Sequence, residues 1–89
     1  MTNIGIDVGA SELVLAIRHK GSVQKKVQTF KNTTSGHQQI VKLCSKYLKY
    51  GKVKIAMEST GVYYFDLAVS LTNSRKFDVL VINPRETKN

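Results

Sequence analysis

The segment from Asn3 to Ile17, NIGIDVGASELVLAI, constrains the fold most, because apolar residues alternate with small or polar ones on both sides of a glycine-containing break. Such alternation places every second side chain on one face of an extended chain and predicts a half-buried β-strand. We expect a strand over residues 3–8, a tight turn at 9–11 and a second strand from Leu13 to Ile17. Asp7 interrupts the first apolar run, and an ionised carboxylate is costly to bury unless it is paired.

Three further segments have the character of strands. Residues 23–31 alternate with many polar side chains, which predicts a third, more exposed strand, and residues 53–58 alternate again as a fourth. The run FDVLVI at 77–82 is continuously apolar, which is typical of a buried parallel strand. Asn83-Pro84 should end this fifth strand, because the residue before a proline is restricted and proline donates no backbone hydrogen bond.

Two helices are expected between these strands. The first is indicated by apolar residues at helical spacing, namely Ile40, Leu43, Cys44, Tyr47 and Leu48. Thr33, Thr34 or Ser35 can cap its start, and Gly51 can end it. Residues 62–71 are apolar nearly all round, so the second helix is expected to be well buried or to join an interface.

The predicted order is β-β-β-α-β-α-β, and the two helical crossovers imply an α/β fold with a mixed five-stranded sheet. All 89 residues form one domain at most. The polar end RETKN stands where another helix would be expected, so we expect the chain to be the N-terminal part of a longer domain.

Charge and composition favour a polyanionic partner. Fourteen basic residues against six acidic ones give a net charge of +8, which suits DNA or RNA. Lys42, Lys46 and Lys49 lie on the outer side of the first helix, either as a solvated face or as a nucleic-acid-facing stripe. No apolar run approaches the length of a membrane span and no signal peptide is visible, so we expect a soluble, cytoplasmic protein without a membrane partner.

Cysteine and histidine offer no chemistry of their own. Cys44 is the single cysteine, which excludes an internal disulfide and suits a reducing cytosol, and we expect it to be a small buried hydrophobe. His19 and His37 are isolated, so we interpret both as surface or capping residues.

Two carboxylates stand at strand ends. Asp7 lies near the end of the first strand, and Glu58 is the last residue of the fourth. If these strands are adjacent and parallel, the carboxylates converge, and a divalent cation between them relieves their repulsion. Oxygen ligands suit Mg²⁺ or Mn²⁺. Alternatively, Asp7 caps the turn before Gly9 and Glu58 caps the following helix.

Two carboxylates bind one cation weakly, and two-metal phosphodiester chemistry calls for three or four. Asp66 and Asp78 are the local candidates, but we expect both to be surface charges. Asp78 lies at the start of its strand, whereas the site is expected at the carboxyl ends of the strands. Asp66 is predicted more than a turn into its helix. The remaining ligands are therefore expected after residue 89.

Four segments in order resemble the N-terminal RuvC-like domain of the DEDD transposases, insertion-sequence recombinases related to the Piv pilin-gene invertase. They are the opening IGIDVGASELVLAI, the F-x-N-T-x-x-G pattern at 30–36, ESTGVY at 58–63 and VINP at 81–84. The resemblance implies a ribonuclease H-like (RuvC-like) fold for residues 1–89 and an acidic tetrad, in which Asp7 matches the first aspartate and Glu58 the glutamate.

The resemblance also implies the chemistry and the partners. These are Mg²⁺ or Mn²⁺, DNA at mobile-element ends and targets, a guide RNA as in some relatives, and a homo-oligomer of the full-length protein. The family's Asp-x-x-Asp motif and its second catalytic domain have no counterpart in these residues, so we expect this fragment to be inactive alone. Arg85 follows the Asn-Pro pair, where it faces a phosphate or solvent.

Two other classes share parts of this pattern. The opening segment is also similar to the phosphate-binding hairpin of the sugar-kinase and actin class, whose strand order is the same. That class does not account for ESTGVY at 58–63. A non-catalytic module that binds RNA or dimerises would account for the charge and the apolar second helix.

Overall fold

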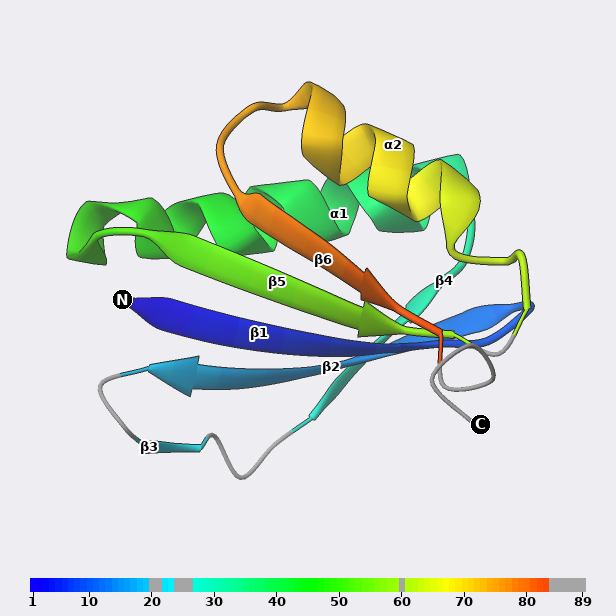
Figure 1. The fold of residues 1–89 in the computed structure, drawn as a ribbon, viewed down its shortest axis with the longest axis horizontal. Helices are drawn as coiled ribbons and strands as arrows, with labels where there is room; N and C mark the ends of the chain where they lie inside the picture. Colours follow the sequence, from blue (N-terminus) through cyan, green and yellow to red (C-terminus); the bar gives the residue numbers. More distant parts are fainter. Residues whose placement is uncertain (20–21, 24–26, 60, 84–89) are drawn as a thin grey trace.

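The computed structural model describes residues 1–19, 22–23, 27–59 and 61–83. Its strands are β1 (Thr2–Val8), β2 (Glu12–His19), β3 (Ser22–Val23), β4 (Gln28–Lys31), β5 (Val53–Glu58) and β6 (Asp78–Ile82). Its helices are α1 (Thr34–Ser45), the 3₁₀ helix η1 (Lys46–Tyr50) and α2 (Phe65–Asn73) (Figure 1).

One mixed sheet organises the chain and confirms the predicted α/β class. Its strand order is β3-β2-β1-β5-β6, and β4 also pairs with β2. Strand β1 is antiparallel to β2 but parallel to β5, and β6 continues the parallel half. The predicted third strand is divided into β3 and β4, which pair with opposite ends of β2, and residues 24–26 between them lie outside the described part.

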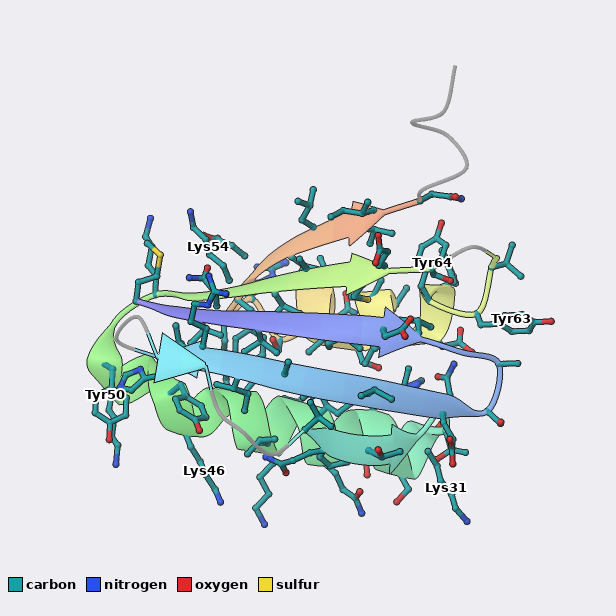
Figure 2. The ribbon with its side chains drawn as sticks, turned by 90° about the horizontal axis from the view of Figure 1, so that it is seen from below. Lys31, Lys46, Tyr50, Lys54, Tyr63 and Tyr64 are labelled. Carbon is teal, nitrogen blue, oxygen red and sulfur yellow. The ribbon has the colours of Figure 1, made fainter. Side chains whose placement is uncertain are left out.

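The sheet has one covered and one open face. Helices α1 and α2 lie on the same side of it (Figure 1), and the view from below shows no described helix on the other (Figure 2). Residues of β1 are alternately buried and exposed, as the sequence predicts. The core between the layers consists of Ile4, Ile6, Val8, Leu13, Leu15, Ile17, Ile40, Cys44, Val53, Ile55, Met57, Leu67 and Leu71.

A compact turn starts α1. The Thr33 hydroxyl accepts a hydrogen bond from the backbone N–H of Gly36 at 3.1 Å, so Thr33 is the N-cap among the three predicted candidates. Gly36 packs against the backbone of Lys31, and a Cβ atom there would overlap the Lys31 carbonyl oxygen. After α1 the chain tightens into η1 and leaves it at Gly51, whose φ of 114° favours glycine. The predicted exit is therefore confirmed.

Two further predicted elements differ from the structure. Helix α2 begins at Phe65 rather than at residue 62, and it buries only the stripe of Leu67 and Leu71 instead of all sides. Strand β6 pairs with β5 in parallel, as predicted, but it has no other partner among the described strands. The prediction that it is buried is wrong, because Leu80 lies beside Ala56 on the open face and is 59% exposed. Among the described residues no helix is long and apolar enough to span a membrane.

Candidate active site at the carboxyl edge of the sheet

Asp7 and Glu58 lie side by side at the carboxyl ends of β1 and β5. The two strands are parallel, and these residues are direct partners in their register. Neighbouring strands are about 4.8 Å apart, and paired residues project to the same face, which here is the open one. Both residues are exposed. The predicted convergence is therefore present without the cost of burying a charge.

The turn after Asp7 is closed by its backbone. The N–H of Gly9 donates to the carbonyl of Glu12 at 2.9 Å. Within the described residues the Asp7 carboxylate accepts no hydrogen bond, so this structure gives no support to the turn-capping alternative. Its oxygens stay available to a ligand from solvent.

Small residues form the floor beside the carboxylates. Gly5 is the register partner of Ala16 on β2 and of Ala56 on β5, so three adjacent strands present almost no side chain at the middle of the open face. A depression of about 380 Å³ lies over this row and includes both Asp7 and Glu58. A ligand can therefore approach the carboxylates along the sheet.

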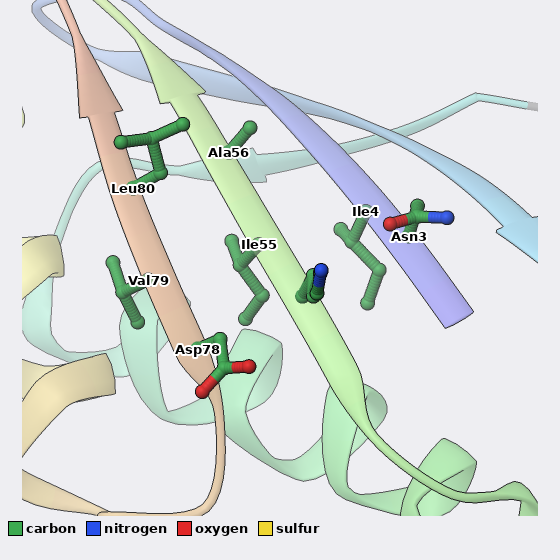
Figure 3. Close-up of a pocket in the computed structure, with 8 residues that line it drawn as sticks. Asn3, Ile4, Ile55, Ala56, Asp78, Val79 and Leu80 are labelled. Atoms are coloured by element: carbon green, nitrogen blue, oxygen red, sulfur yellow. The ribbon is translucent and has the colours of Figure 1, made fainter. Parts of the chain in front are cut away.

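Asp78 does not join the pair. It begins β6, lies opposite Lys54 in the register and is exposed, as predicted for a strand's wrong end. It lines a separate depression of about 440 Å³ with Asn3 and Leu80, towards the other end of the open face (Figure 3).

Asp66 is also exposed, but it lies in the first turn of α2, because that helix starts later than predicted. Within the described part of the chain, no group of three or more acidic, histidine or cysteine side chains is placed to hold a metal ion.

The predicted DNA-binding lysines are exposed but lie away from the carboxylates. Lys46 and Lys49 belong to η1, which contacts the start of β1: the Met1 amino group lies 3.5 Å from the Tyr50 carbonyl. Strand β1 covers seven residues, so about 20 Å separates its two ends. Figure 2 shows Lys46 and Tyr50 at the end of the sheet opposite to Tyr63. Lys42 lies in the last turn of α1, and Arg85 is outside the described residues.

The structure contains a polar network beside the site that the sequence did not predict. The Asn32 side-chain NH₂ donates to the carbonyls of Gly9 at 2.9 Å and Tyr63 at 3.0 Å, and its oxygen lies 2.6 Å from Nε2 of His37. Of the two roles expected for His37, the surface position is wrong, because this side chain is only 4% exposed. Burial lowers the pKa of His37, and the charge of Asp66 opposes this to a smaller extent. Asn32 belongs to the F-x-N-T-x-x-G pattern at residues 30–36, and this pattern is the feature of the sequence that could have pointed to a role for Asn32.

The other histidine and the cysteine have structural roles. His19 is half-buried; its Nδ1 lies 3.0 Å from the Thr2 hydroxyl, and its ring centroid is 4.3 Å from that of Tyr50. Cys44 is fully buried, as predicted, and burial raises the pKa of its thiol to about 12. Neither residue approaches the carboxyl edge.

Solved structures share the fold. The chain is similar to a Bacteroides thetaiotaomicron protein with an actin-like ATPase fold (12% identity, TM-score 0.57), covering 93% of this chain and 33% of that one. It is also similar to ROK hexokinase from Thermus thermophilus (10%, TM-score 0.55, 93% and 35%) and to YeaZ from Pseudomonas aeruginosa (15%, TM-score 0.52, 92% and 43%). The chain thus spans less than half the length of these proteins.

Identities this low establish an actin-like and ribonuclease H-like fold alone, so the fold does not decide between the transposase and sugar-kinase classes. No curated protein matches the sequence. The model of the IS110 group of DEDD enzymes, described as a transposase, matches residues 4–89. Because this match covers nearly the whole sequence, the chain belongs to the IS110-type DEDD transposase family.

Proposed function

We propose that this chain supplies half of a cation-binding catalytic centre that cleaves and joins phosphodiester bonds during DNA transposition. Asp7 and Glu58 are the two ligands that it contributes. The observation that carries the proposal is their register: these two exposed carboxylates are direct partners on adjacent parallel strands. The chain also belongs to a family of transposases, which recombine DNA.

The donor set fits a hard divalent cation. Two like charges about 5 Å apart repel by about 0.8 kcal/mol in water and by several times more near a protein surface. A cation that both carboxylates share removes this repulsion, and oxygen donors favour Mg²⁺ or Mn²⁺ over zinc. When bound at a phosphate, such an ion stabilises charge on the reacting oxygens.

The open face provides a path for the nucleic acid. Asn3 has Arg18 as its register partner on β2 and Lys54 on β5, and all three residues are exposed. They lie four residues before Asp7 along β1, or about 13 Å. A DNA strand that crosses the small-residue floor would meet the positively charged side chains of Arg18 and Lys54 before it reaches the carboxylates. Lys46 and Lys49 would contact a more distant segment.

A recombination assay tests the assignment. Asp7→Asn and Glu58→Gln keep the size of each side chain but remove its charge, so we expect excision and insertion by the protein that contains this chain to fall to background. Asp78→Asn is the matched control, because Asp78 is an exposed carboxylate on the same sheet with no part in the pair. Recombination at the parental rate by either site variant would refute the assignment.

A thermal-shift comparison separates this function from the nucleotide-binding alternative. Mn²⁺ without nucleotide should stabilise the chain, and ATP should add nothing to the effect. Stabilisation that requires ATP would favour the sugar-kinase and actin class instead.

A further inference from the structure

Asn32 connects three loops at the carboxyl edge of the sheet. It follows β4, and its side-chain NH₂ group donates to the carbonyls of Gly9 and Tyr63, which come from the β1–β2 turn and the β5–α2 loop. Its own backbone N–H donates to the Ser11 carbonyl at 2.9 Å, so Asn32 is anchored to the β1–β2 turn twice.

The hydrogen-bond partners fix the orientation of both polar side chains. Because both carbonyls are acceptors, the nitrogen of the Asn32 amide must face them, and its oxygen must face His37. The His37 Nε2 atom is therefore the donor in the 2.6 Å contact, in the Nε2–H form of the ring. His37 belongs to helix α1 and is only 4% exposed, so the partner that orients Asn32 is held in a packed position.

The two loops that Asn32 joins are those that leave the carboxylate-bearing strands. Gly9 is two residues beyond Asp7, and Tyr63 is five beyond Glu58. On the other side, the Ser59 N–H is bonded to the Ile82 carbonyl at 3.1 Å, so the end of β5 is also held by β6. Asn32 thus bridges the β1 and β5 loops directly.

We propose that Asn32, oriented by His37, is a positioning residue that sets the spacing of Asp7 and Glu58 and thereby the affinity of their shared cation. This inference rests on the proposed function of the pair. Groups that orient metal ligands from outside the coordination shell typically change affinity by about 10-fold to 100-fold when they are removed. Asn32 does not contact the carboxylates and acts through the backbone of the loops, so we expect an effect on cation affinity near the lower, tenfold limit.

Mn²⁺ titration of the ¹⁵N-labelled chain tests the inference, because bound Mn²⁺ broadens nearby amide signals. In the unsubstituted chain the signals of residues 7–9 and 58–59 should broaden first. Asn32→Ala should raise the midpoint of this broadening about tenfold. Asn73→Ala, at the exposed end of α2, is the control and should leave the midpoint unchanged.

Substitutions of His37 distinguish positioning from a general loss of packing. His37→Gln retains a donor close to the Nε2 position and should keep the parental midpoint, whereas His37→Leu fills the space without a donor and should raise the midpoint as Asn32→Ala does. Equal midpoints for the glutamine and leucine variants would overturn the role of His37.

The outcomes separate the two proposals. If the unsubstituted chain shows local broadening and Asn32→Ala leaves its midpoint unchanged, the positioning role is wrong while the cation site stands. If the unsubstituted chain shows no local broadening, the cation site fails and the positioning role fails with it. Should Asn32→Ala not fold, scalar couplings across the bonds from the Asn32 amide to the Gly9 and Tyr63 carbonyls decide, and their absence in the unsubstituted chain overturns the inference.

Discussion

Substituting Gly36 by alanine should destabilise this protein, although alanine normally stabilises a helix. In a helix interior alanine is favoured over glycine by about 1 kcal/mol. At Gly36, however, the new Cβ atom would overlap the carbonyl oxygen of Lys31 and crowd its carbonyl carbon. Lys31 ends β4 and is paired with Glu12 on β2, so its backbone cannot move aside without breaking the sheet.

The structure sets the size of the effect. Overpacking costs about 1–3 kcal/mol, and contact with a fixed backbone belongs at the upper limit. After the gain in propensity is subtracted, about 2 kcal/mol of destabilisation remains. For a domain of this size each kcal/mol corresponds to about 4–8 °C, so the midpoint of thermal unfolding should fall by roughly 12 °C, measured by circular dichroism at 222 nm.

Gly5→Ala is the matched control. It makes the same chemical change in strand β1, where a Cβ atom would meet nothing within 4 Å. Alanine is favoured over glycine in strands by about 0.5–1 kcal/mol, so this variant should be slightly more stable than the parent. The reasoning is refuted if Gly36→Ala unfolds at or above the parental temperature, or if both variants shift in the same direction.

Three further predictions concern the same fold. Thr33→Ala removes the N-cap bond to Gly36 and should cost about 1 kcal/mol, measured by urea unfolding; an unchanged urea midpoint would contradict the cap. Leu71→Ala, at a fully buried site on α2, should cost about 2–5 kcal/mol, whereas Leu80→Ala on the exposed edge strand should cost less than about 1 kcal/mol; similar costs at both sites would contradict the burial pattern. Because burial lowers the pKa of His37 in the folded state, the unfolded state binds more protons as the pH falls below 6.5. Its contribution to stability should be complete above that pH and be lost as the pH falls through the folded pKa, and a His37→Gln variant should lack this part of the urea-midpoint profile.

The alternating strands were predictable because their periodicity reflects a one-sided core. In β1, Ile4, Ile6 and Val8 are buried while Asp7 is exposed, as the pattern indicates. The apolar run that forms β6 led to a wrong prediction of burial, since a run without alternation does not distinguish a central strand from an edge strand. Leu80 is exposed because it is the register partner of Ala56 and lies on the open face, which no described helix covers.

The candidate site was predictable in part for a related reason. The placement of Asp7 and Glu58 follows from strand ends and parallel pairing, both of which periodicity and crossover rules supply. The F-x-N-T-x-x-G pattern includes Asn32, but its link to Gly9, Tyr63 and His37 depends on how three loops meet, and the pattern does not show which loops these are. Likewise, the apolar character of Val62 indicated a helix, yet this residue is 75% exposed in the loop before α2.

The binding of Mn²⁺ to Asp7 and Glu58 as a unit is the central claim, and electron paramagnetic resonance tests it directly by counting free and bound Mn²⁺ during a titration. The unsubstituted chain and Asp78→Asn should each bind one ion at this edge of the sheet. Asp7→Asn and Glu58→Gln should each lose that ion, because one carboxylate alone holds it too weakly. Equal Mn²⁺ binding by the unsubstituted chain and by either site variant would contradict the account.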